Sequence, residues 1–310
     1  MHRVERQVSF YYWKTGFHLN GYEKETLQRN AVNTLYVRYC DVDAETGMPH
    51  PVSPVSFDST VRGYNIVPVV YIKNRVFEKA EVNALAQNIF NFITQVNIPA
   101  KEVQFDCDWT ERTKDNYFLF IQKYKELSKQ RVSCTIRLHQ VKYPGRTGIP
   151  PVDHGVLMYY NMGTISAGPQ SSIYERSVAA KYNSFISNYP LTLDVALPIF
   201  SWGLKIRNGK VTGLLNKIYF AHFKNDSNFR YVRENWFSAT NACFKAGYYF
   251  AKGDAVKIEQ VAGAELLQMA NDVNAHSNGK IRNILFYDLD STNLVQYEKD
   301  IFQKVLGRFN

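Results

Sequence analysis

The segment "EVQFDCDWT" (residues 102–110) alternates apolar and polar side chains and ends with two acids and a tryptophan. Successive side chains of a β-strand point to opposite faces. One face then carries Val103, Phe105 and Cys107, and the other carries Gln104, Asp106 and Asp108. An apolar face suits packing against helices, whereas a polar face suits the inside of a closed parallel barrel whose mouth lies at the carboxyl ends of its strands. We therefore predict a barrel strand at 102–109, with Asp108 nearest the mouth.

Seven further segments are rich in β-branched and aromatic residues and are predicted strands. They span residues 8–13, 34–42, 65–73, 133–140, 155–162, 191–202 and 283–289. Helical periodicity falls mostly between them, at 21–32, 77–96, 114–129, 171–188, 262–275 and 292–308. Strands that alternate with helices predict parallel units, and eight such units predict a closed (β/α)8 TIM barrel of the α/β class. An open doubly wound sheet is the alternative, although no glycine-rich phosphate loop follows the first strand.

The connection between the seventh and the eighth predicted strand is about eighty residues long, which is more than one helix and two loops require. We predict one TIM-barrel domain over residues 1–310, with an insertion of extra strands and a helix at about 204–260. The insertion is expected to form a wall on one side of the barrel mouth.

The composition is that of a globular protein, with 45% hydrophobic and 21% charged residues. Lys and Arg number 37 against 28 Asp and Glu, and the formal net charge of +9 would attract anions. These cations are scattered and no nucleic-acid-binding module is present, so no nucleic-acid partner is expected. Aromatic residues make up 15% of the chain, which suits surfaces that stack on sugars as well as strand interiors.

Cysteine spacing and hydropathy argue against a zinc protein and against a transmembrane protein. The four cysteines have no CxxC spacing and no cysteine–histidine cluster resembles a zinc site, so neither a metal nor a cofactor is expected. No apolar stretch approaches the roughly 18 residues of a transmembrane helix. The first ten residues contain no apolar leader core, and the sequence is compatible with a periplasmic protein or a lipoprotein whose leader has been removed.

Polar and aromatic residues gather at the predicted carboxyl ends of the strands, where barrels place their chemistry. Asp106 and Asp108 are the candidate catalytic acids, because two nearby carboxyls drive their pKa values apart. Repulsion predicts that Asp106 keeps its charge and that Asp108 donates a proton, while a structural pair between Asp106 and Arg137 is the alternative. The candidate substrate-binding residues are Trp13, Arg38, Asp41, Trp109, Arg137, His139, Tyr160, Asn161, Trp202 and Asp288. The tryptophans among them would form a floor on which sugars stack.

Three segments carry a resemblance to a known family. "VQFDCDWT" resembles the fourth-strand signature DxxDxDxE of chitinase-like glycoside hydrolases of family 18, in which a tryptophan often precedes the glutamate. "VLMYYNMG" (156–163) resembles their sixth-strand Met-x-Tyr-Asp motif, and "LDVALPIFSWGL" (193–204) resembles their seventh strand. The order of segments along nearly the whole chain is also similar to a group of uncharacterised bacterial proteins of Bacteroides type. The resemblance implies a TIM barrel and a carbohydrate ligand.

Two departures from the family pattern change the expected chemistry. The catalytic glutamate of the signature falls on Thr110, which cannot protonate a glycosidic oxygen, and the sixth-strand aspartate falls on Asn161. A glycoside hydrolase would need a rearranged acid pair, drawn from Asp106, Asp108, Asp43, Asp290 and Glu111. The alternative is a catalytically inactive barrel that binds glycans, and the third class is an unrelated barrel activity or a protein-interaction role. Rim acids that all pair with Arg or Lys would favour binding over hydrolysis.

Overall fold

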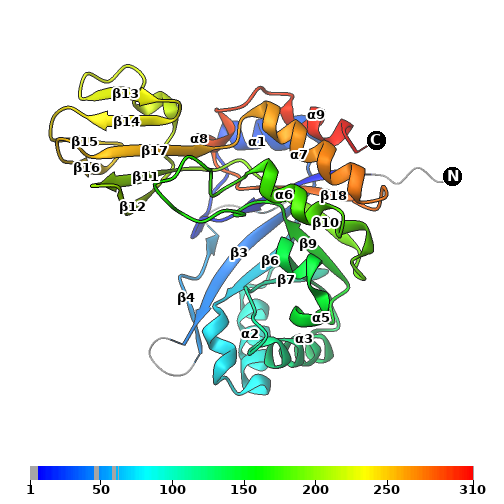
Figure 1. The fold of residues 1–310 in the computed structure, drawn as a ribbon. Helices are drawn as coiled ribbons and strands as arrows, with labels where there is room; N and C mark the ends of the chain where they lie inside the picture. The colour runs from blue at the N-terminus through cyan, green and yellow to red at the C-terminus, as the bar shows by residue number, and fades with distance from the viewer. Residues whose placement is uncertain (1–5, 45–48, 58–60, 62, 310) are drawn as a thin grey trace.

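The computed structural model describes residues 6–44, 49–57, 61 and 63–309, and its centre is a closed parallel barrel (Figure 1). The eight barrel strands are β1 (Gln7–Tyr12), β3 (Thr34–Asp43), β6 (Asn65–Ile72), β7 (Glu102–Asp106), β8 (Arg131–Arg137), β9 (His154–Met158), β10 (Leu193–Pro198) and β18 (Asn283–Tyr287). Each strand pairs in parallel with the next, and β1 closes the barrel by pairing with both β18 and β3. The predicted (β/α)8 barrel is confirmed.

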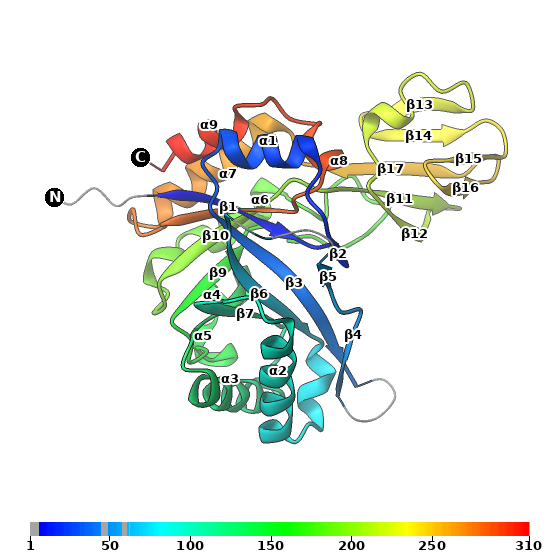
Figure 2. The same ribbon diagram turned by 180° about the vertical axis from the view of Figure 1, so that it is seen from behind.

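Helices cover the outside of the barrel, seen from both sides in Figures 1 and 2. They are α1 (Gly21–Arg29), α2 (Val82–Val96), α3 (Lys114–Ser128), α4 (Leu138–Lys142), α5 (Pro144–Thr147), α6 (Arg176–Asn183), α7 (Gly263–His276), α8 (Ser291–Leu294) and α9 (Ile301–Gly307), with 3-10 turns η1 (Asn74–Glu78), η2 (Ile186–Asn188) and η3 (Phe220–His222). The predicted helix at 77–96 begins later, at Val82, because Glu81 accepts hydrogen bonds from the free N–H groups of the first turn. No helix in the described part of the chain is long and apolar enough to cross a membrane.

The two faces of β7 follow the predicted alternation up to Asp106. Phe105 packs edge-on against Phe120 and Tyr124 of α3, with ring centroids 4.8 and 4.9 Å apart. On the other face, the Gln104 side chain lies inside the barrel and accepts a hydrogen bond of 2.7 Å from the Tyr11 hydroxyl. Apolar side chains therefore face the helices and polar ones fill the barrel interior, as barrel packing requires.

Several barrel strands end earlier than predicted, and the early ends of β7 and β8 change how two candidate side chains are placed. β7 ends at Asp106, so Asp108 lies in the following loop. β8 ends at Arg137, because residues 138–142 turn into α4 and the Gln140 side chain accepts the Arg137 N–H at 2.7 Å. The predictions that Asp108 and His139 are strand residues are wrong. Strand alternation consequently does not determine where either side chain points.

The long connection between β10 and β18 forms an insertion at residues 201–260. Its five-stranded antiparallel sheet consists of β11 (Ser201–Arg207), β12 (Lys210–Asn216), β13 (Phe229–Arg233), β14 (Trp236–Ala239) and β17 (Ala255–Gln260), and a hairpin of β15 (Cys243–Lys245) and β16 (Tyr248–Phe250) packs beside it. Phe223, Phe229, Phe237 and Phe250 form its own small core, separate from that of the barrel. The predicted helix is absent here, since the short turn η3 is the helical element of the insertion. The remaining short strands, β2 (Gly16–Phe17), β4 (His50–Val52) and β5 (Ser56–Phe57), lie at the edge of the barrel.

Candidate ligand site at the barrel mouth

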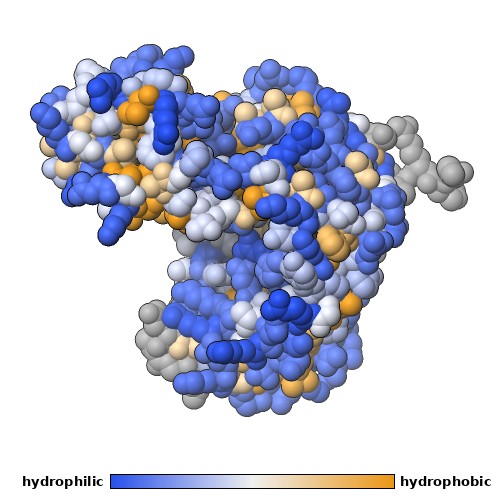
Figure 3. Space-filling view, viewed as in Figure 1, coloured by the Kyte–Doolittle hydropathy of each residue, from blue (hydrophilic) through white to orange (hydrophobic). Residues whose placement is uncertain are grey.

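Two joined cavities lie at the carboxyl ends of the strands, where Figure 3 shows the surface hollowed beneath the insertion. The β8 cavity, of about 450 Å³, is lined by Asp108, Trp109, Thr110, Arg137, Leu138, His139, Tyr160, Asn161, Met162 and Tyr182. The β18 cavity, of about 380 Å³, is lined by Trp13, Lys14, Asp106, Arg137, Met158, Tyr160, Asn161, Phe200, Ser201, Trp202, Asn216, Lys217, Tyr287, Asp288 and Asn293. Arg137, Tyr160 and Asn161 line both, so one ligand can occupy the two cavities together.

Asp108 lies in the loop after β7 and is held by Arg137 at the end of β8. The Arg137 Nε and Nη2 atoms donate to the two Asp108 carboxylate oxygens at 2.5 and 2.9 Å. Half of the Asp108 side chain is exposed, and the paired geometry keeps both charges in place at the edge of the β8 cavity. A carboxylate that is fully engaged by a guanidinium is a poor proton donor, so the predicted role of Asp108 loses its physical basis.

Asp106 is buried two residues earlier, at the end of β7, and accepts a hydrogen bond of 2.7 Å from the Thr135 hydroxyl. Burial raises the pKa of Asp106 to about 6, and the nearby Asp108 charge adds to this shift while Arg137 and Thr135 oppose it. Removal of Asp106 from water thus shifts this carboxyl toward its protonated form, which is opposite to the predicted retention of its charge.

Asp288 follows β18 on the far side of the β18 cavity. Its Oδ1 atom accepts a hydrogen bond of 2.6 Å from Asn293 Nδ2. Burial raises the pKa of Asp288 to about 6, the Asp290 charge adds to the shift, and Lys217 opposes it. Asp106 and Asp288 are thus two carboxyls of the same cavity with raised pKa values, and within the described residues neither is ion-paired to Lys or Arg.

The other acids near the rim are ion-paired. Asp43 binds Lys73 and Arg75, Asp290 binds Lys217 and Lys14, Asp41 binds Arg38, and Glu111 binds Arg146. Arg38 and Asp41, which were predicted to bind substrate, bond to each other at 2.7 Å and line neither cavity. Glu111 also lies outside both cavities, on the exposed turn after β7. These side chains are therefore structural pairs in this structure.

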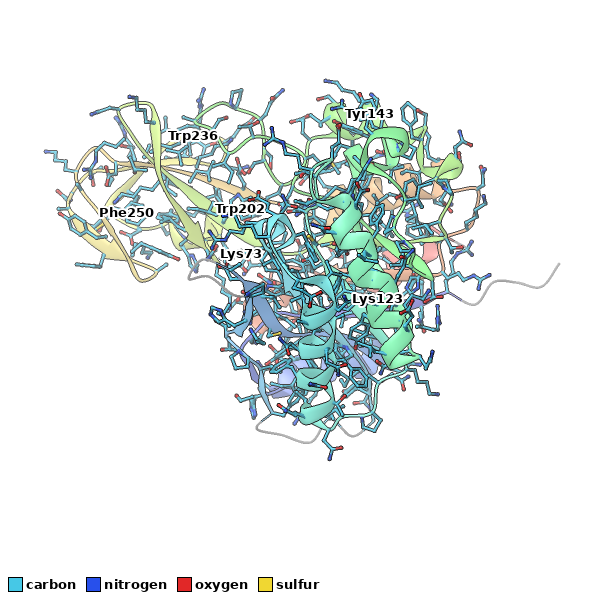
Figure 4. The ribbon with its side chains drawn as sticks, turned by 90° about the horizontal axis from the view of Figure 1, so that it is seen from below. Lys73, Lys123, Tyr143, Trp202, Trp236 and Phe250 are labelled. Atoms are coloured by element: carbon cyan, nitrogen blue, oxygen red, sulfur yellow. The ribbon has the colours of Figure 1, made fainter. Side chains whose placement is uncertain are left out.

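Aromatic rings from β11, from β18 and from the segments that follow β1, β9 and β10 line the β18 cavity. Trp13 lies edge-on to Tyr287 with centroids 5.3 Å apart, and Tyr287 in turn stacks on Tyr160 at 5.6 Å. Trp202 packs against Phe200 at 5.1 Å, and its indole N–H donates to Glu259 Oε2 at 2.9 Å. Figure 4 shows Trp202 at the junction between barrel and insertion. The half-buried faces of Trp13 and Trp202 are available to a ligand in this cavity.

Trp109 does not supply the stacking surface that was predicted for it. Its ring is 2% exposed, stacks on Tyr117 at 5.2 Å and donates its N–H to the Thr147 carbonyl at 2.8 Å. Because β7 has already ended, the chain turns this side chain back under α3 and into the core. Trp109 borders the β8 cavity but offers no open ring face.

The positions at which this chain departs from the chitinase pattern both line the cavities. Thr110 lies in the β8 cavity, where its backbone N–H and hydroxyl bond to the Thr113 hydroxyl. Asn161 lines both cavities and has a left-handed backbone with φ of 53°. His139 lies on α4 in the β8 cavity, and burial lowers its pKa. Asp108, the acid that lines the same cavity as Thr110, is paired with Arg137.

The list of candidate substrate-binding residues lacked several residues of the β18 cavity: Lys14, Phe200, Asn216, Lys217, Tyr287 and Asn293. Lys14 and Phe200 adjoin residues that were selected, and strand-end position was the signal that could have found them. Asn216 and Lys217 come from the insertion, and no sequence pattern connects them to the barrel mouth. Among the described residues, no group of three His, Cys, Asp or Glu side chains could hold a metal ion.

The barrel is of the kind found in chitinase-like proteins of glycoside hydrolase family 18. The spore cortex-lytic enzyme SleL of Bacillus cereus is similar with a TM-score of 0.58 and 13% identity, over 99% of this chain and 75% of that chain. A family 18 chitinase of Pseudoalteromonas aurantia is similar with a TM-score of 0.51 and 8% identity, over 97% and 99% of the chains. The xylanase and α-amylase inhibitor protein XAIP-I, in complex with trehalose, is similar with a TM-score of 0.50 and 10% identity, over 97% and 98%. No family model and no curated protein matches the chain.

Proposed function

We propose that the protein binds a carbohydrate chain in the joined β8 and β18 cavities and does not cleave it. One observation carries this proposal: Thr110 occupies the position of the chitinase proton donor, and Arg137 holds the adjacent Asp108 carboxylate through two hydrogen bonds. Glycoside hydrolysis requires one carboxyl that donates a proton and a second group that stabilises or attacks the sugar. At the position of the chitinase signature, in the β8 cavity, neither group is available.

The retained features of the site suit sugar binding. Trp13 and Trp202 offer half-buried ring faces, which stack on the apolar faces of pyranose rings. Asn161 and Asn216 are exposed and provide amide groups that can donate and accept hydrogen bonds with sugar hydroxyls. The fold shared with SleL and with XAIP-I, which was solved with trehalose, supports a carbohydrate ligand and includes both an enzyme and an inhibitor protein.

The test is a panel of soluble oligosaccharides measured for both binding and cleavage. Isothermal titration calorimetry should detect binding of at least one oligosaccharide, while mass spectrometry of the same mixtures after prolonged incubation should detect no shortened product. Cleavage at a steady rate that scales with protein concentration would refute the inactive barrel. Failure of every oligosaccharide to bind would refute carbohydrate recognition.

A second candidate function, hydrolysis, is favoured by a specific observation on the other side of the mouth. Asp106 and Asp288 line one cavity and have pKa values raised to about 6, so each holds a proton over part of the neutral range. A proton donor of this kind suits a general acid, and the second carboxyl would act once ionised. If the panel reveals cleavage, Asp288→Asn and Asp106→Asn should each lower turnover by about 10²-fold or more, whereas Asp108→Asn should not.

A further inference from the structure

We infer that the bound glycan is acidic, and that a carboxylate or sulfate group of the sugar binds to Arg137 between the two cavities. This inference rests on the proposed function, which it narrows to a class of ligand. It is carried by the hydrogen-bonding geometry of Arg137, by the cations of the β18 cavity and by the charge of the insertion.

Arg137 has donor capacity left toward the ligand. Its Nε and Nη2 atoms are used by Asp108, but Nη1 has no hydrogen-bond acceptor among the described residues. The side chain is about a quarter exposed and lines both cavities. A guanidinium with an unused nitrogen in a ligand cavity binds an anionic oxygen more strongly than a neutral hydroxyl.

Two lysines add positive charge on the opposite wall of the β18 cavity. Lys217 extends from the insertion, is 52% exposed, and contacts Asp290 at 2.6 Å. Lys14 follows β1 and contacts Glu23 at 2.7 Å and the same Asp290 at 3.3 Å. Glu23 neutralises Lys14, and Asp290 is shared by both lysines, so Lys217 is the cation of this wall with the more exposed side chain. An anion that enters the cavity meets cations on both walls.

The two acids of this cavity do not cancel that charge below about pH 6. Their pKa values lie near this pH, so Asp106 and Asp288 become neutral as the solution is acidified. The charged and titratable groups that act on them are Arg137, Asp108, Asp41 and Thr135 for Asp106, and Asp290, Lys217, Lys14 and Asn293 for Asp288. Ionisation above about pH 6 adds negative charge to the cavity, and binding of an anion should weaken in that direction.

The positive charge of the insertion is an independent observation that supports an acidic ligand. Residues 201–260 contain ten Lys and Arg against four Asp and Glu, so this segment carries six of the nine net positive charges of the chain. Trp202 and Trp236 lie on one face of its sheet, because they pair with Glu259 and Lys257, two residues apart on β17. Arg233 stacks over Trp236 at 4.8 Å, and Figure 4 shows Trp236 on the insertion. A long acidic chain leaving the cavity past Trp202 would be attracted to this wall.

The test compares acidic oligosaccharides with a neutral form of the same chain. Calorimetry would use tetragalacturonate, its fully methyl-esterified form and a carrageenan tetrasaccharide, whose anionic groups are all sulfates. Tetragalacturonate should bind at least roughly tenfold more tightly than its ester at pH 5 and low salt, since the charged group adds charge-assisted hydrogen bonds. Binding of the sulfated chain as well would assign the site to anionic sugars in general, and its absence would assign it to carboxylates.

Variants separate Arg137 from general surface charge. The double variant Asp108→Asn/Arg137→Gln removes both partners of the ion pair and should bring the ratio of the affinities for tetragalacturonate and its ester close to one. Lys123→Gln, on the distant α3 (Figure 4), is the matched control and should leave both affinities unchanged. The affinity of the unmodified protein for tetragalacturonate should fall between pH 5 and pH 7.5. The fall should be smaller in Asp288→Asn, because this variant has one carboxyl fewer that ionises in the cavity.

The outcomes distinguish the two proposals. If the ester or other neutral sugars bind as tightly as tetragalacturonate, the inference of an acidic ligand is wrong and the proposed carbohydrate binding stands. If the double variant retains the preference for the acid, Arg137 is not the anchor. If no member of either class binds, the proposed function itself fails.

Discussion

An aspartate lies on each of the two sides of the barrel mouth, but the two carboxyls have different partners and different degrees of burial. On the β7–β8 side, Asp108 is half exposed and bound to Arg137 through both carboxylate oxygens. On the β10–β18 side, Asp288 is held by an amide, has a pKa raised to about 6 and faces partly open aromatic rings. The first side is where the segment that resembles the chitinase signature falls, and there Asp108 is held in an ion pair. The second side keeps the features of a ligand site.

This difference shows that residue type alone does not identify a catalytic acid. Asp106 and Asp108 are two positions apart, yet one is buried and bonded to a hydroxyl while the other is at the surface and bonded to a guanidinium. Removal from water disfavours the charged form of a carboxyl, and a guanidinium partner favours it. Burial and hydrogen-bond partners therefore determine whether a carboxyl holds a proton, and the spacing of the acids in the sequence does not.

The largest effect is expected on stability, from removal of the Glu259 hydrogen-bond network that connects the insertion to the barrel mouth. Glu259 Oε2 accepts from the Trp202 indole, the Ser172 N–H and the Ser172 hydroxyl, and its Oε1 atom lies 2.7 Å from the buried Lys257 Nζ. Glu259→Ala leaves Lys257 as a buried, unpaired charge, so the free energy of unfolding should fall by about 3 to 5 kcal/mol in urea titrations.

Two further variants control for other causes. Glu234→Ala removes an exposed acid of the insertion and should change stability by no more than about 0.5 kcal/mol. The double variant Glu259→Met/Lys257→Met should recover much of the loss, because it leaves no buried charge. An unchanged urea midpoint in Glu259→Ala would show that this network does not support the site.

The next largest effect is expected at the aromatic wall of the β18 cavity. Trp202→Ala removes a half-buried ring and should weaken binding of an identified oligosaccharide by about 2 kcal/mol, or roughly 30-fold, since stacking on the ring buries apolar sugar surface. Trp236→Ala, on the same sheet but outside both cavities, is the control and should retain more of the affinity for a short oligosaccharide. Equal losses in the two variants would place the ligand elsewhere.

A smaller effect is expected from neutralising Asp106. Its folded pKa of about 6 lies above the ordinary value near 3.9, so the ionised form destabilises the fold and stability declines as pH rises from about 4 to 6. Asp106→Asn should remove this decline and raise the free energy of unfolding at pH 7.5 by roughly 1 to 2 kcal/mol, with a weaker Thr135 hydrogen bond included. At pH 4 the variant should show no gain. Urea titrations at both pH values test this, and destabilisation at pH 7.5 would contradict it.

The smallest effect is expected from restoring the family's proton donor alone. Thr110→Glu places an acid in the β8 cavity, but Arg137 still holds Asp108 and Asn161 still replaces the sixth-strand aspartate. No measurable cleavage of chito-oligosaccharides should appear in product assays of this variant. The triple variant Thr110→Glu/Asn161→Asp/Arg137→Ala is the companion experiment. Activity in Thr110→Glu by itself would show that the ion pair is no obstacle to catalysis.

The sequence by itself determined the barrel and the identity of its strands. Period-two alternation in β7 and the amphipathic stripe of α2 are local patterns, and burial of one face follows from them wherever the element lies. The length of the β10–β18 connection similarly predicted an insertion. The sequence also showed that Thr110 stands at the position of the signature glutamate, because a motif position is found by alignment of residues alone.

Only the tertiary structure decided where the strands stop and how the rim charges pair. Ending β7 at Asp106 sent Trp109 into the core, and ending β8 at Arg137 brought its guanidinium onto Asp108. Lys217 reaches the cavity from an insertion whose path over the mouth has no local sequence signal. Strand ends, ion pairs and pKa values depend on side chains that are distant in sequence and on exclusion of water, so they arise only when the whole chain is packed.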